Sequence, residues 1–376
     1  MKKQFKAEIS SAMINVKFIT FFLVFIIFSF CLPLSGSFAE EVVSRSVVAM
    51  DASNGRILYA KNPHLRRAPA STTKLMTAIV VMENADLDDT VTISRNAAQV
   101  SPHKAGFREG DKVTFEKLLY AALLGSANDA AVALAEGVSG SEERFVELMN
   151  RKALTIGATN TKFINPNGLP GPGQYITAYD LAKIMGYALR YPKLKEIIGT
   201  RVAEISTERG KEIFLRNTNR LLWSEEDLLG GKTGYTRTAR HCFVCAAERE
   251  KETIIVAVLG SPSRQTLWDE SEMLISKGFD VMGNREKPMV YVTNVSDDDT
   301  YVKKASSRKY TKSKKGKKLI AKKTVKNGKT KMLAEKKGKK KHLTAKKKGS
   351  KKTFAKKKAK KNYRIAKKNG AEKTKG

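Results

Sequence analysis

The stretch Ala70-Ser71-Thr72-Thr73-Lys74-Leu75-Met76 decides how this sequence is interpreted, because it places a serine three residues before a lysine at the start of an apolar run. Pro69 stands two residues before the serine, where a helix can begin. Residues three apart lie on one face of a helix, so Ser71 and Lys74 are predicted to be neighbours. A serine hydroxyl needs a base to become a good nucleophile, and a lysine among apolar residues has a lowered pKa and can be that base. The first turn of the helix also offers free N–H groups to a developing oxyanion.

The Ser-x-x-Lys pattern is not specific by itself. It recurs at Ser101–Lys104 and at Ser306–Lys309, and a chain of this length contains it about twice by chance. In the alternative interpretation, Ser71 only caps the N-terminus of a helix. The rest of the sequence has to decide between the two.

The positive charge of the chain is concentrated at one end. The 376 residues carry a formal net charge of +34. Residues 301–376 hold 34 Lys or Arg against 2 Asp or Glu, whereas residues 1–300 hold 37 against 35. The Lys-rich segment has too few apolar residues to form a core, so we expect it to be disordered.

The first 39 residues have the pattern of an export signal. Four lysines precede an apolar core from Phe18 to Leu32, and Ser37-Phe38-Ala39 offers the small residues that a signal peptidase recognises. We expect cleavage after Ala39 and a mature protein in the periplasm or cell envelope. The alternative is an uncleaved membrane anchor, although about 15 apolar residues are few for a spanning helix.

The cysteines are interpreted as ordinary thiols. Cys31 falls within the predicted signal peptide, and Cys242 and Cys245 lie in an alternating, strand-like run. Residues three apart on a strand point to opposite faces, which argues against a disulfide between them. The chain has four histidines and lacks a second Cys/His pair at the spacing of metal ligands. We therefore expect two core thiols, no metal and no cofactor.

Strand-like segments lie at both ends of the predicted globular part, and helix-like segments lie between them. The pair Asn54-Gly55 is typical of a hairpin turn. This order predicts an α/β domain of the α+β type, with an antiparallel sheet built from N- and C-terminal strands, covered by helices and flanked by an all-helical lobe. The predicted elements are strands 42–50 and 56–60, a helix from 71, a strand at 90–93, helices 114–123, 130–136, 142–156 and 177–190, strands 201–206, 211–215, 241–248 and 253–259, and a helix at 267–282.

Four parts are predicted along the chain. They are a signal peptide at 1–39, a globular domain at 40–282, a polar linker at 283–302 and the basic tail at 303–376. No internal repeats are present.

Two further motifs fall in the predicted domain. Ser126-Ala127-Asn128 sits at a break between helices, where a hydroxyl and a carboxamide can face one cleft, but turns favour both residue types and Ser94-Arg95-Asn96 also matches. Lys232-Thr233-Gly234 occurs once, at the start of a strand. A glycine there lets a ligand approach the backbone, and a lysine beside a hydroxyl suits an anionic group. The alternative for this motif is an edge strand with a solvated lysine.

Together, the three motifs occur in the order used by penicillin-recognising serine enzymes. The chain resembles the low-molecular-mass penicillin-binding proteins that act as D-alanyl-D-alanine carboxypeptidases, serine peptidase family S11. The resemblance covers roughly 43–282 and implies the penicillin-binding/β-lactamase-like transpeptidase fold, with 40–282 as the catalytic domain. Further similar stretches are Val48-Ala-Met-Asp-Ala-Ser-Asn-Gly-Arg-Ile-Leu, Gly125-Ser-Ala-Asn-Asp-Ala-Ala, Asn165-Pro-Asn-Gly-Leu, Gly173-Gln-Tyr with Asp180, and Asn219-Arg-Leu-Leu-Trp223.

The resemblance implies the catalytic roles. Ser71 is expected to attack the carbonyl between the two terminal D-alanines of a peptidoglycan pentapeptide, with Lys74 as its base. Ser126 is expected to pass a proton to the leaving amine. The N–H groups of Ser71 and Tyr235 are expected to form the oxyanion hole.

The resemblance also implies the binding residues. Asn128 is expected to hold the backbone of the substrate, and Lys232-Thr233-Gly234 its terminal carboxylate. Some members of the family bind the carboxylate with an arginine near the start of the last helix. The register places Leu267 there, so Arg264 is the candidate substitute. Many members carry a histidine where Asn167 stands.

The implied partners are the pentapeptide stem of peptidoglycan and β-lactams as inhibitors. A β-lactamase or D,D-endopeptidase of the same fold and a non-enzymatic binding module are the alternatives. For the basic tail we expect an anionic envelope polymer or membrane surface. Export makes nucleic acid a poorly available partner.

Overall fold

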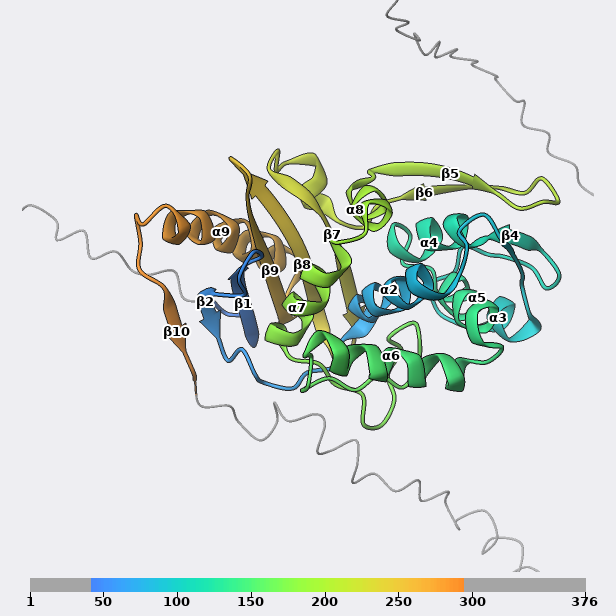
Figure 1. The fold of residues 1–376 in the computed structure, drawn as a ribbon, viewed down its shortest axis with the longest axis horizontal. Helices are drawn as coiled ribbons and strands as arrows, with labels where there is room; N and C mark the ends of the chain where they lie inside the picture. The colour runs from blue at the N-terminus through green and yellow to red at the C-terminus, as the bar shows by residue number, and fades with distance from the viewer. Residues whose placement is uncertain (1–41, 294–376) are drawn as a thin grey trace, which may run out of the picture. The chain divides into compact units, whose positions relative to one another are not determined.

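The computed structural model describes residues 42–293, and a six-stranded sheet lies at the centre of this region (Figure 1). The strand order is β10-β2-β1-β9-β8-β7, and all neighbours are antiparallel except β10 and β2. The strands are β1 (Ser46–Asp51), β2 (Ile57–Lys61), β7 (Leu228–Thr236), β8 (Arg240–Arg249), β9 (Glu252–Ser261) and β10 (Met289–Tyr291). N- and C-terminal strands therefore share one sheet, as predicted.

The β1–β2 hairpin turns where the Asn-Gly pair predicts it. Gly55 has a φ of 75°, which a residue without Cβ adopts at little cost. The carboxylate of Asp51 accepts hydrogen bonds from the Ser53 amide, the Ser53 hydroxyl and the Asn54 side chain, so the turn is held from inside.

Two apolar clusters cover the two faces of the sheet. Cys242 belongs to the cluster shared with the helical lobe and Cys245 to the cluster beneath the C-terminal helix, and both thiols are free and buried. The prediction that they point to opposite faces and do not pair is confirmed. Burial raises the pKa of the Cys242 thiol to about 11.

One helix covers the outer face of the sheet. Helix α9 (Arg264–Met282) packs its buried residues, among them Leu267, Leu274 and Phe279, against β9, β8 and β1. It begins three residues before the predicted start because the side chain of Ser263 caps it by accepting from the Thr266 amide.

The other face carries the helical part of the molecule (Figure 1). Helix α2, which is buried along most of its length, runs through the centre of this part, and α7 lies across β1 and β9. The helices are α2 (Lys74–Asn84), α3 (Arg95–Gln99), α4 (Phe115–Leu123), α5 (Asn128–Ser139), α6 (Glu142–Ile156), α7 (Ala178–Ala188) and α8 (Pro192–Gly199), with short 3-10 helices η1 (Ala70–Thr73) and η2 (Arg220–Trp223).

Four short strands form two ribbons outside the main sheet. They are β3 (Thr90–Thr92) with β4 (Lys112–Thr114), and β5 (Val202–Ser206) with β6 (Glu212–Arg216). The β5 and β6 segments were predicted as strands, but their alternating pattern does not indicate which strands they pair with.

Three local features differ from the sequence prediction. Helix α8 is additional, because Pro192 stands at its first position and starts a helix there. Helix α7 begins with the pattern Thr-x-x-Asp, which is typical of a capping box. The side chain of Thr177 does cap the helix, but the Asp180 carboxylate accepts from Asn160 and Thr161 and does not complete the box. Residues 289–291, inside the segment assigned to a linker, form the edge strand β10.

Within residues 42–293, the structure contains no helix with the length and apolar character needed to cross a membrane. The predicted signal peptide, its cleavage after Ala39 and the basic tail lie outside the described residues.

Candidate active site

Ser71 lies in a tight turn directly before helix α2. It is the second residue of η1, which runs directly into α2, and the preceding Ala70 has the left-handed φ of 49°. Neither helix uses Ser71 as its N-cap, since Pro69 precedes η1 and Thr73 precedes α2. The alternative in which Ser71 merely caps a helix is therefore wrong.

Lys74 has no exposed surface, and its amine makes three contacts. Its Nζ lies 3.1 Å from Ser71 Oγ, 2.7 Å from Asn128 Oδ1 and 2.7 Å from the carbonyl oxygen of Asn167. Burial lowers the pKa of Lys74 well below its ordinary value, and the charge of Lys232 lowers it further, while Asp129 opposes the shift.

These three contacts suit a neutral amine. A neutral amine has two N–H groups and one lone pair, and a carboxamide oxygen and a carbonyl oxygen can accept the two N–H groups. The lone pair is then left for the third partner, the hydroxyl of Ser71. With its lowered pKa, Lys74 can thus accept the proton that Ser71 has to lose.

Ser126 and Lys232 form the second hydroxyl–amine pair. Lys232 is fully buried. Its Nζ donates to Ser126 Oγ at 3.0 Å and to the carbonyl oxygen of Thr233 at 2.9 Å. Burial lowers the pKa of Lys232 to about 7. Ser126 lies in the turn before α5 and has a φ of 58°, which is uncommon for a residue with a side chain.

Asn128 is fixed by the loop that precedes β4. Its backbone amide donates to the carbonyl of His103 at 2.8 Å, and its Nδ2 donates to the carbonyl of Pro102. The next residue, Asp129, is fully buried, and its carboxylate accepts from the three successive amides of residues 105–107. The first turn of α5 therefore holds both the carboxamide and the loop beside it.

The edge strand β7 passes directly over the Ser71 turn. A Cβ at Gly234 would lie 2.9 Å from the amide nitrogen of Ser71, so only glycine lets the strand approach this closely. Thr233 precedes it, and its hydroxyl lies 2.6 Å from the hydroxyl of Thr218. Tyr235 follows, with a side chain that is 56% exposed.

The loop Pro166-Asn167-Gly168 packs against Lys74 and the Ser71 turn. Asn167 supplies its carbonyl to Lys74, and the carbonyl of Pro166 accepts from Thr77 at 2.6 Å. Gly168 has a φ of 84°, and a Cβ there would lie 1.8 Å from the carbonyl oxygen of Ala70. This glycine is therefore required for the loop to pack against the Ser71 turn.

Residues 35–263 match the family model described as D-alanyl-D-alanine carboxypeptidase, peptidase S11. The chain belongs to this family. Over 223 residues it is 37% identical to D-alanyl-D-alanine carboxypeptidase DacF of Bacillus subtilis, covering 58% of this chain and 57% of that one. Over 240 residues it is 34% identical to DacB2 of Mycobacterium tuberculosis, covering 62% and 81%. The chain thus spans little more than half the length of the Bacillus relative.

Solved structures confirm the predicted fold. A single-residue variant of the Streptomyces K15 DD-transpeptidase superposes with a TM-score of 0.61 at 32% identity, covering 64% of this chain and 98% of that chain. A D-alanyl-D-alanine carboxypeptidase from Mycobacterium tuberculosis gives a TM-score of 0.60 at 33% identity, covering 63% and 90%.

The fold brings Ser71, Lys74 and Asn128 into contact, and likewise Ser126 and Lys232, but Arg264 lies apart from these groups. It is exposed at the first position of α9, and within residues 42–293 no hydrogen bond or ion pair joins it to the lysine–serine pairs described above. It lies near His241, whose pKa is lowered by burial and then by Arg264 and Arg240, and His241 stacks on Tyr235 at 4.5 Å between ring centroids. Leu267 is only 2% exposed and belongs to the core under α9.

Sequence reasoning did not assign a role to several residues of the site. Asn167 and Asp129 lie in stretches that are similar to the family, but the sequence did not show what these two residues contact. Thr218 directly precedes another such stretch, and its hydroxyl contacts that of Thr233. No group of three or more His, Cys, Asp or Glu in the described part of the chain is arranged to hold a metal.

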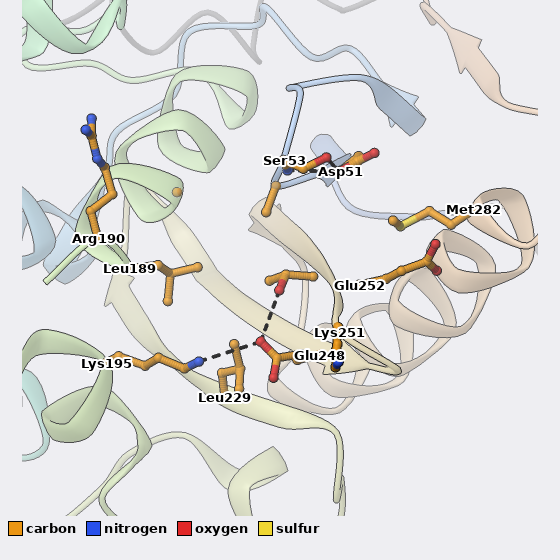
Figure 2. A pocket seen from close by; sticks show the side chains of 13 residues that line it. Asp51, Ser53, Leu189, Arg190, Lys195, Leu229, Glu248, Lys251, Glu252 and Met282 are labelled. Atoms are coloured by element: carbon orange, nitrogen blue, oxygen red, sulfur yellow. Dashed lines mark hydrogen bonds and ion pairs between the residues drawn. The ribbon is translucent and has the colours of Figure 1, made fainter. Parts of the chain in front are cut away.

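A cavity of about 450 Å³ lies elsewhere on the molecule (Figure 2). It opens between α7, α8 and the turns of the β1–β2 and β8–β9 hairpins, and Lys195 reaches across it to Glu248 at 3.6 Å. None of the residues predicted for the active site lines it. This cavity is therefore separate from the cluster formed by Ser71, Lys74, Ser126 and Lys232.

Proposed function

We propose that this S11 chain is a serine-type D-Ala-D-Ala carboxypeptidase that removes the terminal D-alanine from peptidoglycan pentapeptides through an acyl-enzyme. The observation that carries the proposal is the buried Lys74 amine, 3.1 Å from the Ser71 hydroxyl and with its pKa lowered. Burial lowers the pKa of this amine and so favours its uncharged form, the form that can act as a base.

Acylation begins at Ser71. Lys74 takes the hydroxyl proton while Ser71 Oγ bonds to the carbonyl carbon between the two D-alanines. The negative charge moves to the carbonyl oxygen, which the N–H groups of Ser71 and Tyr235 stabilise. Each such donor lowers the barrier by about 3 kcal/mol.

Collapse of the tetrahedral intermediate breaks the C–N bond. The nitrogen of the leaving D-alanine needs a proton, and Ser126 passes one to it, with Lys232 as its hydrogen-bond partner at 3.0 Å. Water then attacks the Ser71 ester: its proton goes to Ser126, which gave one up, and Lys74 returns the proton it took to Ser71 Oγ as the ester bond breaks. The products are the shortened peptide and D-alanine, and the enzyme is restored.

Substrate binding can use the hydrogen-bonding capacity that Asn128 has left. Its Oδ1 accepts from Lys74 and its Nδ2 donates to the Pro102 carbonyl. A carboxamide oxygen can accept a second hydrogen bond and its nitrogen can donate a second one, so Asn128 can hold the peptide backbone of the substrate while keeping both contacts. Lys232, Thr233 and Arg264 are the groups proposed for the terminal carboxylate, with Gly234 allowing close approach to the strand.

A labelled penicillin tests the proposal, because a β-lactam mimics the D-Ala-D-Ala unit and acylates the same hydroxyl. We expect a long-lived adduct on Ser71 that is absent from Ser71→Ala, and release of D-alanine from a pentapeptide by the wild-type protein alone. Rapid turnover of the penicillin would indicate a β-lactamase. No adduct would indicate a binding module and overturn the proposal.

A D,D-endopeptidase is the second candidate. The supporting observation is a relative from Pseudomonas aeruginosa named D-alanyl-D-alanine endopeptidase, 31% identical over 241 residues, covering 62% of this chain and 77% of that one. Incubation with cross-linked and uncross-linked muropeptides separates the two activities. Preferential cleavage of the cross-link would favour the endopeptidase.

The proposed location is the periplasm or cell envelope, reached by export and cleavage after Ala39. The Lys-rich segment 303–376 is proposed to bind an anionic envelope polymer or membrane surface, because 34 basic against 2 acidic residues in 301–376 provide strong electrostatic attraction.

A further inference from the structure

The side-chain hydroxyl groups of Thr218 and Thr233 form a pair beside the Ser126–Lys232 contact. Their Oγ1 atoms are 2.6 Å apart, which is a short hydrogen bond between two hydroxyl groups. Thr233 lies on β7 next to the buried Lys232, whereas Thr218 comes from the segment between β6 and η2. Neither the family motifs nor the mechanism above gives Thr218 a role.

The backbone holds Thr218 in place from both sides. Its amide donates to the carbonyl of Leu124 at 3.2 Å, two residues before Ser126. Its neighbours Asn217 and Asn219 are buried, and Asn217 donates from its side chain to the carbonyl of Thr200 at 2.9 Å. Thr218 itself is exposed. The segment therefore holds one exposed hydroxyl between the Ser126 turn and β7.

Which of the two hydroxyl groups donates decides whether Thr233 can bind an anionic ligand. If Thr233 donates to Thr218, its lone pairs face the ligand and repel a carboxylate. If Thr218 donates to Thr233, the Thr233 hydrogen is free to donate to the carboxylate, and hydrogen bonds to a charged acceptor are roughly twice as strong as neutral ones. Binding of a carboxylate therefore selects the second arrangement.

We propose that Thr218 is a positioning residue for carboxylate recognition: it donates to Thr233 and so directs the Thr233 hydroxyl to the terminal carboxylate of the substrate. This inference rests on the proposed function, because it assumes that the cleft binds a D-Ala-D-Ala-like ligand. It makes selectivity for a free terminal carboxylate depend on a side chain outside the three motifs.

The test compares two ligands that differ only in the carboxylate. The second-order rate constant for acylation of the full-length protein is measured with a penicillin that has a free carboxylate and with its methyl ester. Thr218→Val keeps the shape of the side chain but removes the donor. We expect its rate constant with the acid to fall about tenfold, equivalent to about 1.4 kcal/mol, and its rate constant with the ester to remain within about twofold, because the ester has no charge to recognise.

Two control variants complete the experiment. Thr218→Ser keeps the hydroxyl and should restore the acid rate to within about threefold of wild type. Thr155→Val removes an exposed threonine hydroxyl from α6, far along the chain from the site, and should leave both rates unchanged.

The outcomes separate the role of Thr218 from the proposed function. Equal losses with the acid and the ester, or no loss with either, would overturn the role of Thr218 while leaving the proposed function in place. Failure of Thr218→Ser to restore the acid rate would also overturn it. A wild-type protein that reacts with neither compound would overturn the proposed function and this inference together.

Discussion

Lys232 donates a hydrogen bond to Ser126 over 3.0 Å although 106 positions separate them in the chain. Lys232 comes from the edge strand of the sheet and Ser126 from the turn before α5, so this bond joins the sheet to the helical lobe. Because Ser126 is the only hydroxyl in contact with the Lys232 amine among the described residues, the pair should act as a unit.

Replacing Ser126 with alanine should therefore impair acylation. Loss of a positioned proton-transfer group typically costs about 10²- to 10⁴-fold, and we expect a loss in this range in the rate of penicillin acylation. The matched control is Ser139→Ala, which removes a hydroxyl at the far end of α5. A rate for Ser126→Ala equal to that of the control would show that Ser126 takes no part in the reaction.

The lowered pKa of Lys232 should appear in the pH dependence of stability. Lys232 titrates at about 7 in the folded protein and at about 10.4 in an unfolded chain. Between these values the unfolded chain binds more protons, so the free energy of unfolding rises with pH, by up to about 1.4 kcal/mol per pH unit for this one group. Lys232→Met removes the group, and its free energy of unfolding should rise less steeply over this window.

Urea denaturation of both proteins at several pH values from 6 to 10 measures the difference in slope. The control is Lys195→Met, since Lys195 is part of a partly exposed ion pair. Parallel curves for wild type and Lys232→Met would mean that Lys232 is not an unusually weak base in the folded protein.

The glycines of the Asn165–Tyr175 loop offer a matched pair of substitutions. Gly168 and Gly173 have nearly the same φ, 84° and 82°. A Cβ at Gly168 would strike the carbonyl of Ala70, whereas a Cβ at Gly173 has open space around it. Gly173→Ala should cost about 1 kcal/mol for the left-handed backbone, and Gly168→Ala should cost more than about 3 kcal/mol because the backbone also has to move.

Acylation gives a second measure of the same pair. Movement of the Ala70 carbonyl displaces the adjacent Ser71, so Gly168→Ala should react slowly with penicillin even at temperatures where it remains folded. Gly173→Ala should react like wild type. Equal thermal stability and equal reaction rates for the two variants would contradict the close packing of this loop on the Ser71 turn.

The sequence predicts the residues that carry side-chain chemistry better than those that act through the backbone. Ser71 and Lys74 follow from helical spacing, and the order of the three motifs brings in Ser126, Asn128 and Lys232. Asn167 could not be predicted as a Lys74 partner, because it contributes a carbonyl oxygen that any residue would supply. Contacts of this kind depend on the path of the chain and leave no signal in residue type.

The fold shows the same limit. The Asn54-Gly55 turn and α6 (Glu142–Ile156) were predicted correctly because turn chemistry and helical periodicity are local signals. Strands β5 and β6 were predicted as strands, yet their pairing with each other outside the main sheet depends on packing against the rest of the molecule. Thr218, which follows β6, was missed for the same reason.

The basic tail leads to the last prediction, which concerns attachment to the cell envelope. Residues 301–376 carry 34 basic and 2 acidic residues, whereas the rest of the chain is close to neutral. Each basic residue near an anionic surface contributes about 1 kcal/mol, and salt screens this attraction within a distance of about 10 Å at 0.1 M. The full-length protein should therefore sediment with envelope fractions in low salt and be released by high salt, whereas a chain ending at residue 300 should stay in the supernatant at both. Penicillin labelling of the truncated chain checks that its active site is intact, and equal fractionation of the two proteins in low salt would rule out this role for the tail.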